Sequence, residues 1–417
     1  MKLRTNILYT LLFILILFAK GSAQDYPLEI DYYNFIHYDK NILEYEGNAK
    51  QYYDRFFEKT NKLVLQGDQL IHILHIGDSH IQADYFPGQM RNRIQTLNKD
   101  GISARGFLFP FRAAKTNNPP DFKVETTTQW ERCRSVTKGY GCALGIAGIN
   151  IKSSDSISTL TIKAAEGDYL PYSFNKIRIF HNLQEVYYDI EVLNYEGPVS
   201  RTYHYDQGLT EIEFKHELNR VDLRFTRLDS IKAPFVFHGI SFESNDPGIV
   251  YSSVGVNGAE TRSFNKCYLL QNQLKALNPD WMIISLGTND AYMRNFNSAN
   301  FYANYDTLIS RIREVLPDAA LLLTVPGDSY RSRRYPNYNT SKARDQIKIL
   351  AKKHHAAVWD FYEIMGGQNS INYWYAKGLA NRDKLHFTKA GYKLQGDLLF
   401  NAFLKSYDSF NLNRMAN

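Results

Sequence analysis

Residues 71–80, which read IHILHIGDSH, carry the pattern that decides the fold. The run is apolar and rich in β-branched residues, and it stops at Gly77, which is typical of a buried strand in a parallel sheet. A helix is expected soon afterwards, over residues 87–97, because apolar side chains recur there on one helical face. A buried strand that leads into a helix predicts an α/β fold.

The same alternation returns in the second half of the chain. Apolar runs predict buried strands, and segments with a helical period predict the helices between them. The expected strands are residues 281–286, 320–325 and 356–360, and the expected helices are residues 47–66, 269–277, 302–316, 342–354 and 390–404. Strands that alternate with helices predict a mainly parallel sheet covered on both faces.

The middle of the chain has a different character. From residue 121 to about residue 243 it shows short alternating segments separated by turn residues, and no helical period of useful length. The clearest segments are residues 158–164, 176–181, 186–194, 211–214 and 221–225. This pattern is typical of an antiparallel β-sandwich. We therefore expect one α/β domain, residues 24–118 and 247–417, interrupted by a β module over residues 119–246.

Residues 1–23 have the form of a signal peptide. Lys2 and Arg4 give a basic start, residues 6–19 are almost entirely apolar, and small residues end the segment at Ala23. A membrane anchor is the alternative, but the apolar run is shorter than the ~20 residues that span a bilayer. We expect the protein to be exported and the mature chain to be periplasmic or extracellular.

The charge of the chain is modest. The formal net charge is +6, and Lys2, Arg4 and Lys20 contribute half of it. A small charge spread over a large surface favours neither nucleic-acid binding nor strong membrane attraction. No second apolar run approaches membrane-spanning length. We expect no nucleic-acid partner and no stable membrane insertion after signal cleavage.

Three cysteines leave two alternatives open. Cys133 and Cys142 could close a short loop with Cys267 left free, as an oxidising compartment would allow, or all three could be buried thiols. No cysteine or histidine has the spacing of zinc ligands. We expect no metal site and no cofactor.

The turn after the first strand holds a candidate nucleophile. Gly77-Asp78-Ser79-His80 places Ser79 at the carboxyl edge of a parallel sheet, where ligands of open α/β folds bind. The amide of Ser79 can point at a developing oxyanion. Alone this is a weak signal, because such turns often contain Gly, Asp and Ser for their geometry only.

Two further motifs supply the groups that a catalytic serine needs. Gly287-Thr288-Asn289-Asp290 closes the strand 281–286, so that the Asn289 amide can reach the same oxyanion, although an Asn there can also be a helix cap. Near the C-terminus, Asp383 and His386 are three residues apart on a loop. A serine hydroxyl needs a base, and an imidazole needs a carboxylate that fixes its tautomer.

In this order and context, the three motifs resemble the blocks of the SGNH (GDSL) hydrolase superfamily. The resemblance implies a three-layer α/β fold and a catalytic triad of Ser79, Asp383 and His386. The superfamily's second block falls on residues 255–259 (GVNGA), where we favour Gly258 over Gly255. The implied oxyanion hole consists of the amides of Ser79 and Gly258 and the side chain of Asn289.

A narrower likeness joins the stretch HIGDSH, residues 75–80, to GFLFP, residues 106–110. Together they look like the bacterial peptidoglycan O-acetylesterases, in which a carbohydrate-binding-like β-sandwich is inserted between the first and second blocks. The likeness implies a secreted serine esterase that removes O-acetyl groups from a cell-envelope glycan through an acetyl-Ser79 intermediate. Peptidoglycan is the first choice of substrate.

The sequence leaves several alternatives open. The same triad could serve an acetylesterase of plant or dietary polysaccharide or a glycan O-acetyltransferase, and a non-catalytic glycan-binding protein is the alternative of another class. Four aromatic residues of the insert could stack on sugar rings or form the sandwich core: Trp130, Tyr140, Tyr172 and Tyr187. The sequence does not predict the oligomeric state.

Overall fold

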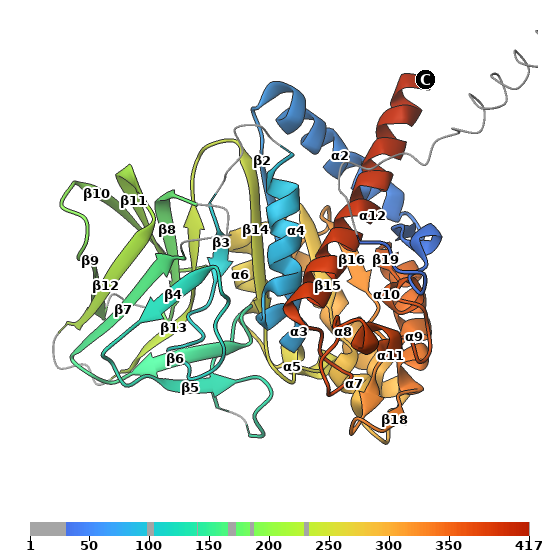
Figure 1. Ribbon diagram of the computed structural model, residues 1–417. Helices are drawn as coiled ribbons and strands as arrows, with labels where there is room; N and C mark the ends of the chain where they lie inside the picture. Colours follow the sequence, from blue (N-terminus) through green and yellow to red (C-terminus); the bar gives the residue numbers. More distant parts are fainter. Residues whose placement is uncertain are drawn as a thin grey trace, which may run out of the picture. The chain divides into compact units, whose positions relative to one another are not determined.

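The structure is a computed structural model that describes residues 31–97, 104–139, 141–165, 172–183, 187–228 and 233–416. Its α/β part is built on a six-stranded sheet with the order β1–β19–β16–β15–β2–β14 (Figure 1). The strands are β1 (Glu44–Tyr45), β2 (Leu70–Gly77), β14 (Gly248–Gly255), β15 (Trp281–Ser285), β16 (Ala320–Thr324) and β19 (Ala357–Trp359). All neighbours are parallel except β1 on β19, so the prediction of a mainly parallel sheet is confirmed.

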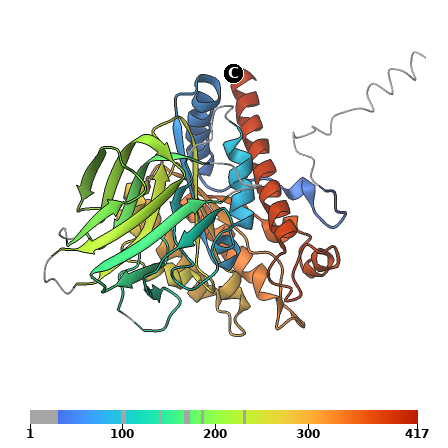
Figure 2. The same cartoon turned by 60° about the vertical axis from the view of Figure 1, so that its left-hand side comes forward.

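Helices pack in two groups beside this sheet. The first group, α2, α4 and α12, contains the N-terminal and C-terminal helices, and α4 lies along α12 (Figures 1 and 2). It comprises α2 (Ala49–Gln66), α4 (Tyr85–Gln95) and α12 (Lys389–Ala416). The second group comprises α5 (Thr261–Asn265), α6 (Leu270–Leu277), α8 (Ser298–Val315) and α9 (Asn339–His354). The α/β part also contains short helices: η1 (Tyr38–Lys40), α3 (Ser79–Gln82), α7 (Thr288–Tyr292), α10 (Phe361–Ile364) and α11 (Ile371–Ala376).

The inserted module consists of two antiparallel sheets. One has the order β10–β11–β8–β13–β6–β5, with β3 also paired to β13, and the other has the order β4–β7–β12–β9. The first sheet contains β3 (Gly106–Leu108), β5 (Glu131–Arg134), β6 (Ile149–Ser153), β8 (Phe174–His181), β10 (Val199–His204), β11 (Leu209–Leu218) and β13 (Phe235–Glu243). The second contains β4 (Phe122–Glu125), β7 (Ile157–Ala164), β9 (Tyr188–Val192) and β12 (Arg220–Arg227). An α/β fold with an inserted antiparallel β module, as predicted, is therefore confirmed (Figure 2).

Domain limits within this unit are less sharp than the sequence pattern indicates. Residues 34–417 group together by their internal contacts, separately from residues 1–33. Strand β3 already pairs with β13 of the module, although it precedes the predicted start at residue 119. The limits at residues 118 and 246 remain predictions. The signal peptide predicted over residues 1–23 lies outside the described residues, and within the described ranges no helix combines the length and apolarity needed to cross a bilayer.

A buried charge cluster of Asp84, Arg91, Arg105 and Asp121 joins the module to the α/β part. Arg91 on α4 forms two hydrogen bonds with Asp84, at 2.9 and 3.0 Å, and one with Asp121 at 3.1 Å. Arg105 bonds Asp121 at 2.5 Å and Asp84 at 3.3 Å. Burial raises the pKa of Asp84, but the two guanidinium groups more than offset this effect and lower it overall. The cluster thus connects α4 to Asp121, the residue just before β4.

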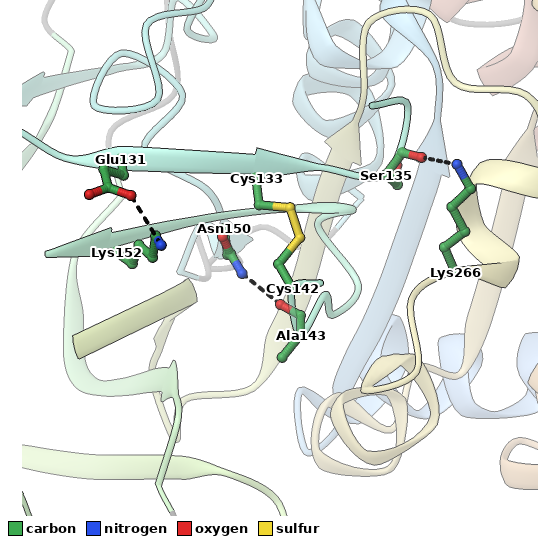
Figure 3. Close-up of a disulfide and its surroundings, with 8 residues drawn as sticks. All are labelled: Glu131, Cys133, Ser135, Cys142, Ala143, Asn150, Lys152 and Lys266. Atoms are coloured by element: carbon green, nitrogen blue, oxygen red, sulfur yellow. Dashed lines mark hydrogen bonds and ion pairs between the residues drawn. A yellow bond between two sulfur atoms is a disulfide. The ribbon is translucent and has the colours of Figure 1, made fainter. Parts of the chain in front are cut away.

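A disulfide joins Cys133, on β5, to Cys142 within the module (Figure 3). Their Cα atoms are 6.4 Å apart, within the range that a disulfide spans. Cys267 is a free, buried thiol, and burial raises its pKa to about 12. Of the two alternatives left open for the cysteines, the structure contains the disulfide-closed loop.

Two of the four aromatic residues considered for sugar stacking belong to the core. Trp130 is 4% exposed and packs edge-on against Phe225, and Tyr172 is 7% exposed. Tyr187 is partly buried against the same core, and Tyr140 lies outside the described residues. The rings of Trp130 and Tyr172 are therefore unavailable for stacking on a sugar, because the sandwich interior covers them.

Candidate active site

Strand register brings three of the predicted segments to one edge of the sheet. Gly77 at the end of β2 pairs with Gly255 on one side and with Ser285 on the other. Since β2, β14 and β15 are parallel, their carboxyl ends lie at the same level. The loops that carry Ser79, Gly258 and Asn289 therefore leave the sheet side by side.

The turn that presents Ser79 requires its glycine. A Cβ atom on Gly77 would lie 2.3 Å from Cγ1 of Ile81 and 2.5 Å from the carbonyl oxygen of Ser285. Asp78 then caps the short helix α3, because its carboxylate accepts a hydrogen bond from the amide of His80 at 3.0 Å. Ser79 is the first residue of this helix and is partly exposed.

The structure brings the predicted triad together. The distance from Ser79 Oγ to His386 Nε2 is 3.0 Å, and the distance from His386 Nδ1 to Asp383 Oδ2 is 2.8 Å. Because an ionised carboxylate only accepts, Nδ1 of His386 carries the proton, and Nε2 presents a lone pair to the Ser79 hydroxyl. The arrangement can therefore remove a proton from the serine as it attacks an electrophile.

Asp383 is held by its own loop. Its Oδ1 accepts hydrogen bonds from the amides of Leu385 and His386, both at 3.0 Å. Partial burial raises the pKa of Asp383, but hydrogen bonds from the His386 ring and the two amides outweigh it and lower the pKa to about 2. In return, the bond to Asp383 raises the pKa of His386, although burial opposes it. The carboxylate is thus ionised wherever the imidazole is neutral.

A second histidine supports the first. The ring of His80 stacks on that of His386, with centroids 5.1 Å apart and an interplanar angle of 27°. Nδ1 of His80 lies 2.9 Å from the hydroxyl of Tyr392, on α12. Burial, together with the neighbouring His386, lowers the pKa of His80 to about 3, so its ring is neutral. His80 therefore packs against the base, and Tyr392 is a site residue that the sequence alone did not indicate.

The predicted oxyanion donors differ in how they are held. The Asn289 amide donates to the Ala259 carbonyl oxygen at 2.9 Å and to Asp78 Oδ2 at 3.3 Å. To bind an oxyanion, Asn289 must exchange one of these bonds, and the longer bond to Asp78 is the weaker of the two. Burial raises the pKa of Asp78 to about 6.

The two glycines of the second block have different surroundings. A Cβ atom on Gly255 would lie 2.3 Å from the carbonyl oxygen of Asp78, so Gly255 permits close packing under the nucleophile turn. Gly258 is exposed, has a φ of +82°, and would have nothing within 4 Å of such a Cβ atom. A positive φ favours glycine and turns the backbone away from the strand. This geometry is compatible with the choice of Gly258, whose role as a donor remains a prediction.

Metal ligation is not evident at this edge. Within the part of the chain that the structure describes, no group of three or more His, Cys, Asp or Glu side chains is arranged to hold an ion. The chemistry that the described residues support is nucleophilic, with Ser79 as nucleophile and His386 as base.

Comparison with known proteins gives the same fold. Residues 238–394 match the GDSL-like Lipase/Acylhydrolase family. The match includes Gly258, Asn289, Asp383 and His386 but leaves out Ser79, which lies on the other side of most of the inserted strands. No curated protein matches the chain.

Solved structures provide further comparisons. A peptidoglycan O-acetylesterase structure is similar with a TM-score of 0.67 and 22% identity, over 88% of this chain and 99% of that one. The acetylxylan esterase Axe2 from Geobacillus stearothermophilus is 19% identical over 39% of this chain and 73% of its own, with a TM-score of 0.30. The GDSL-like lipase BT0569 from Bacteroides thetaiotaomicron VPI-5482 is 19% identical over 36% of this chain and 74% of its own, with a TM-score of 0.28.

The first of these structures spans both the α/β part and the inserted module, and so shows that the whole arrangement is a known fold. The family match covers residues 238–394, which lie mostly in the second half of the α/β part, and the description of that family names acyl hydrolysis. Residues 238–394 therefore match the GDSL-like Lipase/Acylhydrolase family, and the chain has the fold of the peptidoglycan O-acetylesterase structure, with an antiparallel β module inserted in its α/β part.

Proposed function

We propose that this protein is an exported serine esterase that removes O-acetyl groups from a cell-envelope glycan, with peptidoglycan as the first choice. The observation that carries the proposal is the hydrogen-bonded chain from Ser79 through His386 to Asp383, at 3.0 and 2.8 Å. The similarity in fold to a peptidoglycan O-acetylesterase supports the choice of glycan.

The first half of the reaction forms the acyl-enzyme. Oγ of Ser79 attacks the acetyl carbonyl carbon while Nε2 of His386 takes the hydroxyl proton. The oxyanion is stabilised by the amides of Ser79 and Gly258 and by the Asn289 side chain. When the intermediate collapses, the sugar oxygen leaves with the proton from His386, and acetyl-Ser79 remains.

The second half returns the enzyme to its starting state. His386 takes a proton from a water molecule, whose oxygen attacks the acetyl carbon. Collapse of this second intermediate breaks the bond to Ser79, and Oγ regains its proton from His386 as acetate leaves. If a sugar hydroxyl replaces the water, the same steps give an acetyltransferase.

Export is part of the proposal. The basic start and apolar run of residues 1–23 have the form of a signal peptide. The disulfide between Cys133 and Cys142 supports an oxidising compartment, because such bonds persist outside the cytosol.

The test is acetate release by the mature protein from O-acetylated peptidoglycan and from acetylated xylan, side by side. Ser79→Ala is the control and should lower kcat by about 10⁶-fold, as loss of the nucleophile does in other triads. Ser79-dependent release from peptidoglycan alone supports the proposal. Release mainly from xylan would move the protein to polysaccharide digestion, and no release by folded protein would leave a transferase or a glycan-binding protein.

A further inference from the structure

A groove of about 550 Å³ lies outside the catalytic residues. It is formed by the end of α7, the residues just after it, and the hairpin of β17 (Tyr330–Arg331) and β18 (Tyr335–Pro336). Its lining residues are Tyr292, Met293, Arg294, Arg331, Ser332, Tyr335, Pro336 and Tyr338. Nothing in the proposed mechanism uses any of them.

Two hydrogen bonds connect this groove to the catalytic loops. The amide of Tyr330 donates to the carbonyl oxygen of Lys384 at 2.8 Å, and Lys384 directly follows Asp383. The amide of Ser332 donates to the hydroxyl of Tyr292 at 3.0 Å, and Tyr292 ends the helix that contains Asn289. Figure 1 accordingly shows β18 beside α7. A glycan whose acetyl group reaches Ser79 therefore has this groove as a neighbouring surface.

The charge of the groove is positive and uncompensated. Arg294 and Arg331 line it, and Arg333 and Arg334 are exposed in the hairpin turn. None of these four guanidinium groups forms an ion pair with a residue in the described ranges, and Nε of Arg331 is buried there without a partner. None of the lining residues is acidic. Arginine binds carboxylates through paired, charge-assisted hydrogen bonds, so this is the chemistry of a site for carboxylates.

Exposed rings lie beside these charges. Tyr335 is 60% exposed and Tyr338 is 59% exposed, whereas aromatic side chains in proteins are mostly covered. A tyrosine ring offers a flat apolar face with a polar edge, which suits ligands that are partly apolar and partly wet, as a sugar ring is. Rings and guanidinium groups together favour an acidic carbohydrate over a neutral one.

We propose that the groove binds carboxylate groups of the glycan whose ester is cleaved at Ser79. The inference rests on the proposed function and narrows the substrate to glycans that display carboxylates. In peptidoglycan these belong to the stem peptides, or to the lactyl groups of sugars that carry no peptide. The groove would then hold an acidic strand in place while its acetyl group enters the catalytic site.

Binding to an inactive protein tests this directly. The probe is soluble, de-O-acetylated peptidoglycan, and its affinity is measured by calorimetry on the Ser79→Ala protein. Adding Arg294→Gln and Arg331→Gln should weaken binding on the order of tenfold, as expected for loss of about 1.4 kcal/mol of charge-assisted bonding. The matched control, Lys62→Gln with Arg414→Gln, removes two exposed charges far along α2 and α12 and should leave affinity unchanged.

Chemical variants of the probe identify the group that is bound. Strands whose carboxyl groups have been converted to neutral amides should lose the tenfold difference between parent and variant. An amidase removes the peptides and frees the lactyl carboxylates, which are otherwise in amide linkage. A retained difference shows that the groove accepts a lactyl carboxylate, and a lost difference assigns the groove to the stem peptide. Either of these assignments supports a carboxylate site.

Equal affinity of the parent and the Arg294→Gln/Arg331→Gln protein, with unchanged melting temperatures, would overturn the inference. So would undiminished binding of the amidated strands. Both outcomes are separate from failure of the proposed function, which would appear as absent Ser79-dependent acetate release in the otherwise unmodified enzyme.

Discussion

The catalytic pair of Asp383 and His386 and the buried charge cluster both join acidic to basic side chains, and the two sets differ in exposure. The side chains of Asp383 and His386 are 38% and 36% exposed, respectively. In the buried charge cluster, Arg105 is fully covered and the least buried member, Asp121, is only 6% exposed. Both sets consist of carboxylates and nitrogen cations or bases held by short hydrogen bonds.

The difference lies in what each set leaves unshared. His386 uses one ring nitrogen for Asp383 and presents the other to Ser79, and its proton can move in the range where enzymes work. In the buried cluster both carboxylates are shared between guanidinium groups, which do not lose their protons in proteins. The comparison teaches that a charged pair becomes reactive when one partner can titrate and keeps a free position. A buried pair whose cation keeps its proton instead holds two parts of the fold together.

The largest effect on activity should follow from neutralising Asp383, the partner of His386. Asp383→Asn keeps a hydrogen-bonding side chain but removes the carboxylate that fixes the His386 tautomer, and kcat should fall about 10⁴-fold. Steady-state kinetics with p-nitrophenyl acetate measure the loss. Nearly full activity in a folded Asp383→Asn protein would show that Asp383 has no part in the reaction.

The same variant should move the pH profile. His386 acts only when neutral, so kcat/KM of the parent should fall as pH drops through the raised pKa of His386. Without the carboxylate, that pKa falls and the acid limb of the profile moves to lower pH. A limb that stays in place would mean that another group controls it.

Breaking the buried charge cluster should affect stability instead. Arg91→Met leaves the charges of Asp84 and Asp121 buried with Arg105 alone, so the free energy of unfolding should drop by about 3–5 kcal/mol. Urea denaturation measures it. The control is Arg55→Met, because the Arg55–Asp318 pair is exposed and should be worth less than about 1 kcal/mol. Equal losses in the two variants would remove the distinction drawn between buried and exposed pairs.

A smaller effect on kcat is expected from loss of Asn289, the predicted side-chain donor to the oxyanion. Asn289→Ala should lower kcat by about 10²–10³-fold and change KM little, because the donor acts in the transition state. Kinetics on the same small ester, with a melting curve to verify folding, make the measurement. An unchanged kcat would mean that Asn289 serves only its bonds to Asp78 and Ala259.

The smallest effect is expected from Tyr392, which is hydrogen-bonded to the His80 ring that stacks on His386. Tyr392→Phe removes the hydrogen bond to His80 and should lower kcat/KM by a factor of about 2–10, the usual range for one neutral bond. Tyr85→Phe is the matched control, since Tyr85 stacks on Tyr392 but makes no hydrogen bond through its hydroxyl to a described residue. If both variants behave alike, the stack on His386 needs no support from Tyr392.

Much of the site could be predicted because its signals are local. A strand that ends in glycine, followed by a serine, is visible within ten residues, and so is the Asp-x-x-His spacing of Asp383 and His386. The structure brings these side chains together as expected. Tyr392 could not be predicted as a partner of His80, because the two are 312 residues apart and meet only through the packing of α12.

Strand β14 shows why part of the fold could not be predicted. Its sequence, GIVYSSVG, includes two serines that weaken the apolar pattern, yet all its residues are buried. Ser252 accepts a hydrogen bond from the amide of Phe107, and Ser253 bonds the buried charge cluster. Polar side chains satisfied by distant partners are invisible to periodicity.

The final helix was predicted too short for a related reason. It was expected to end at residue 404 but continues to Ala416. Residues 405–416 are largely polar, but Tyr407 and Phe410 pack on the Phe57 ring of α2. These contacts with the start of the chain favour helix where the local pattern is weak.

The hydrogen bond between Ser79 and His386 joins residues that are 307 positions apart in the chain. A ribosome therefore makes the nucleophile long before it makes the base. Any chain that stops short of residue 386 contains the serine without a partner to remove its proton. Truncated products should be inert, and esterase activity reports that synthesis has passed the loop between α11 and α12 and that both segments of the α/β part have come together.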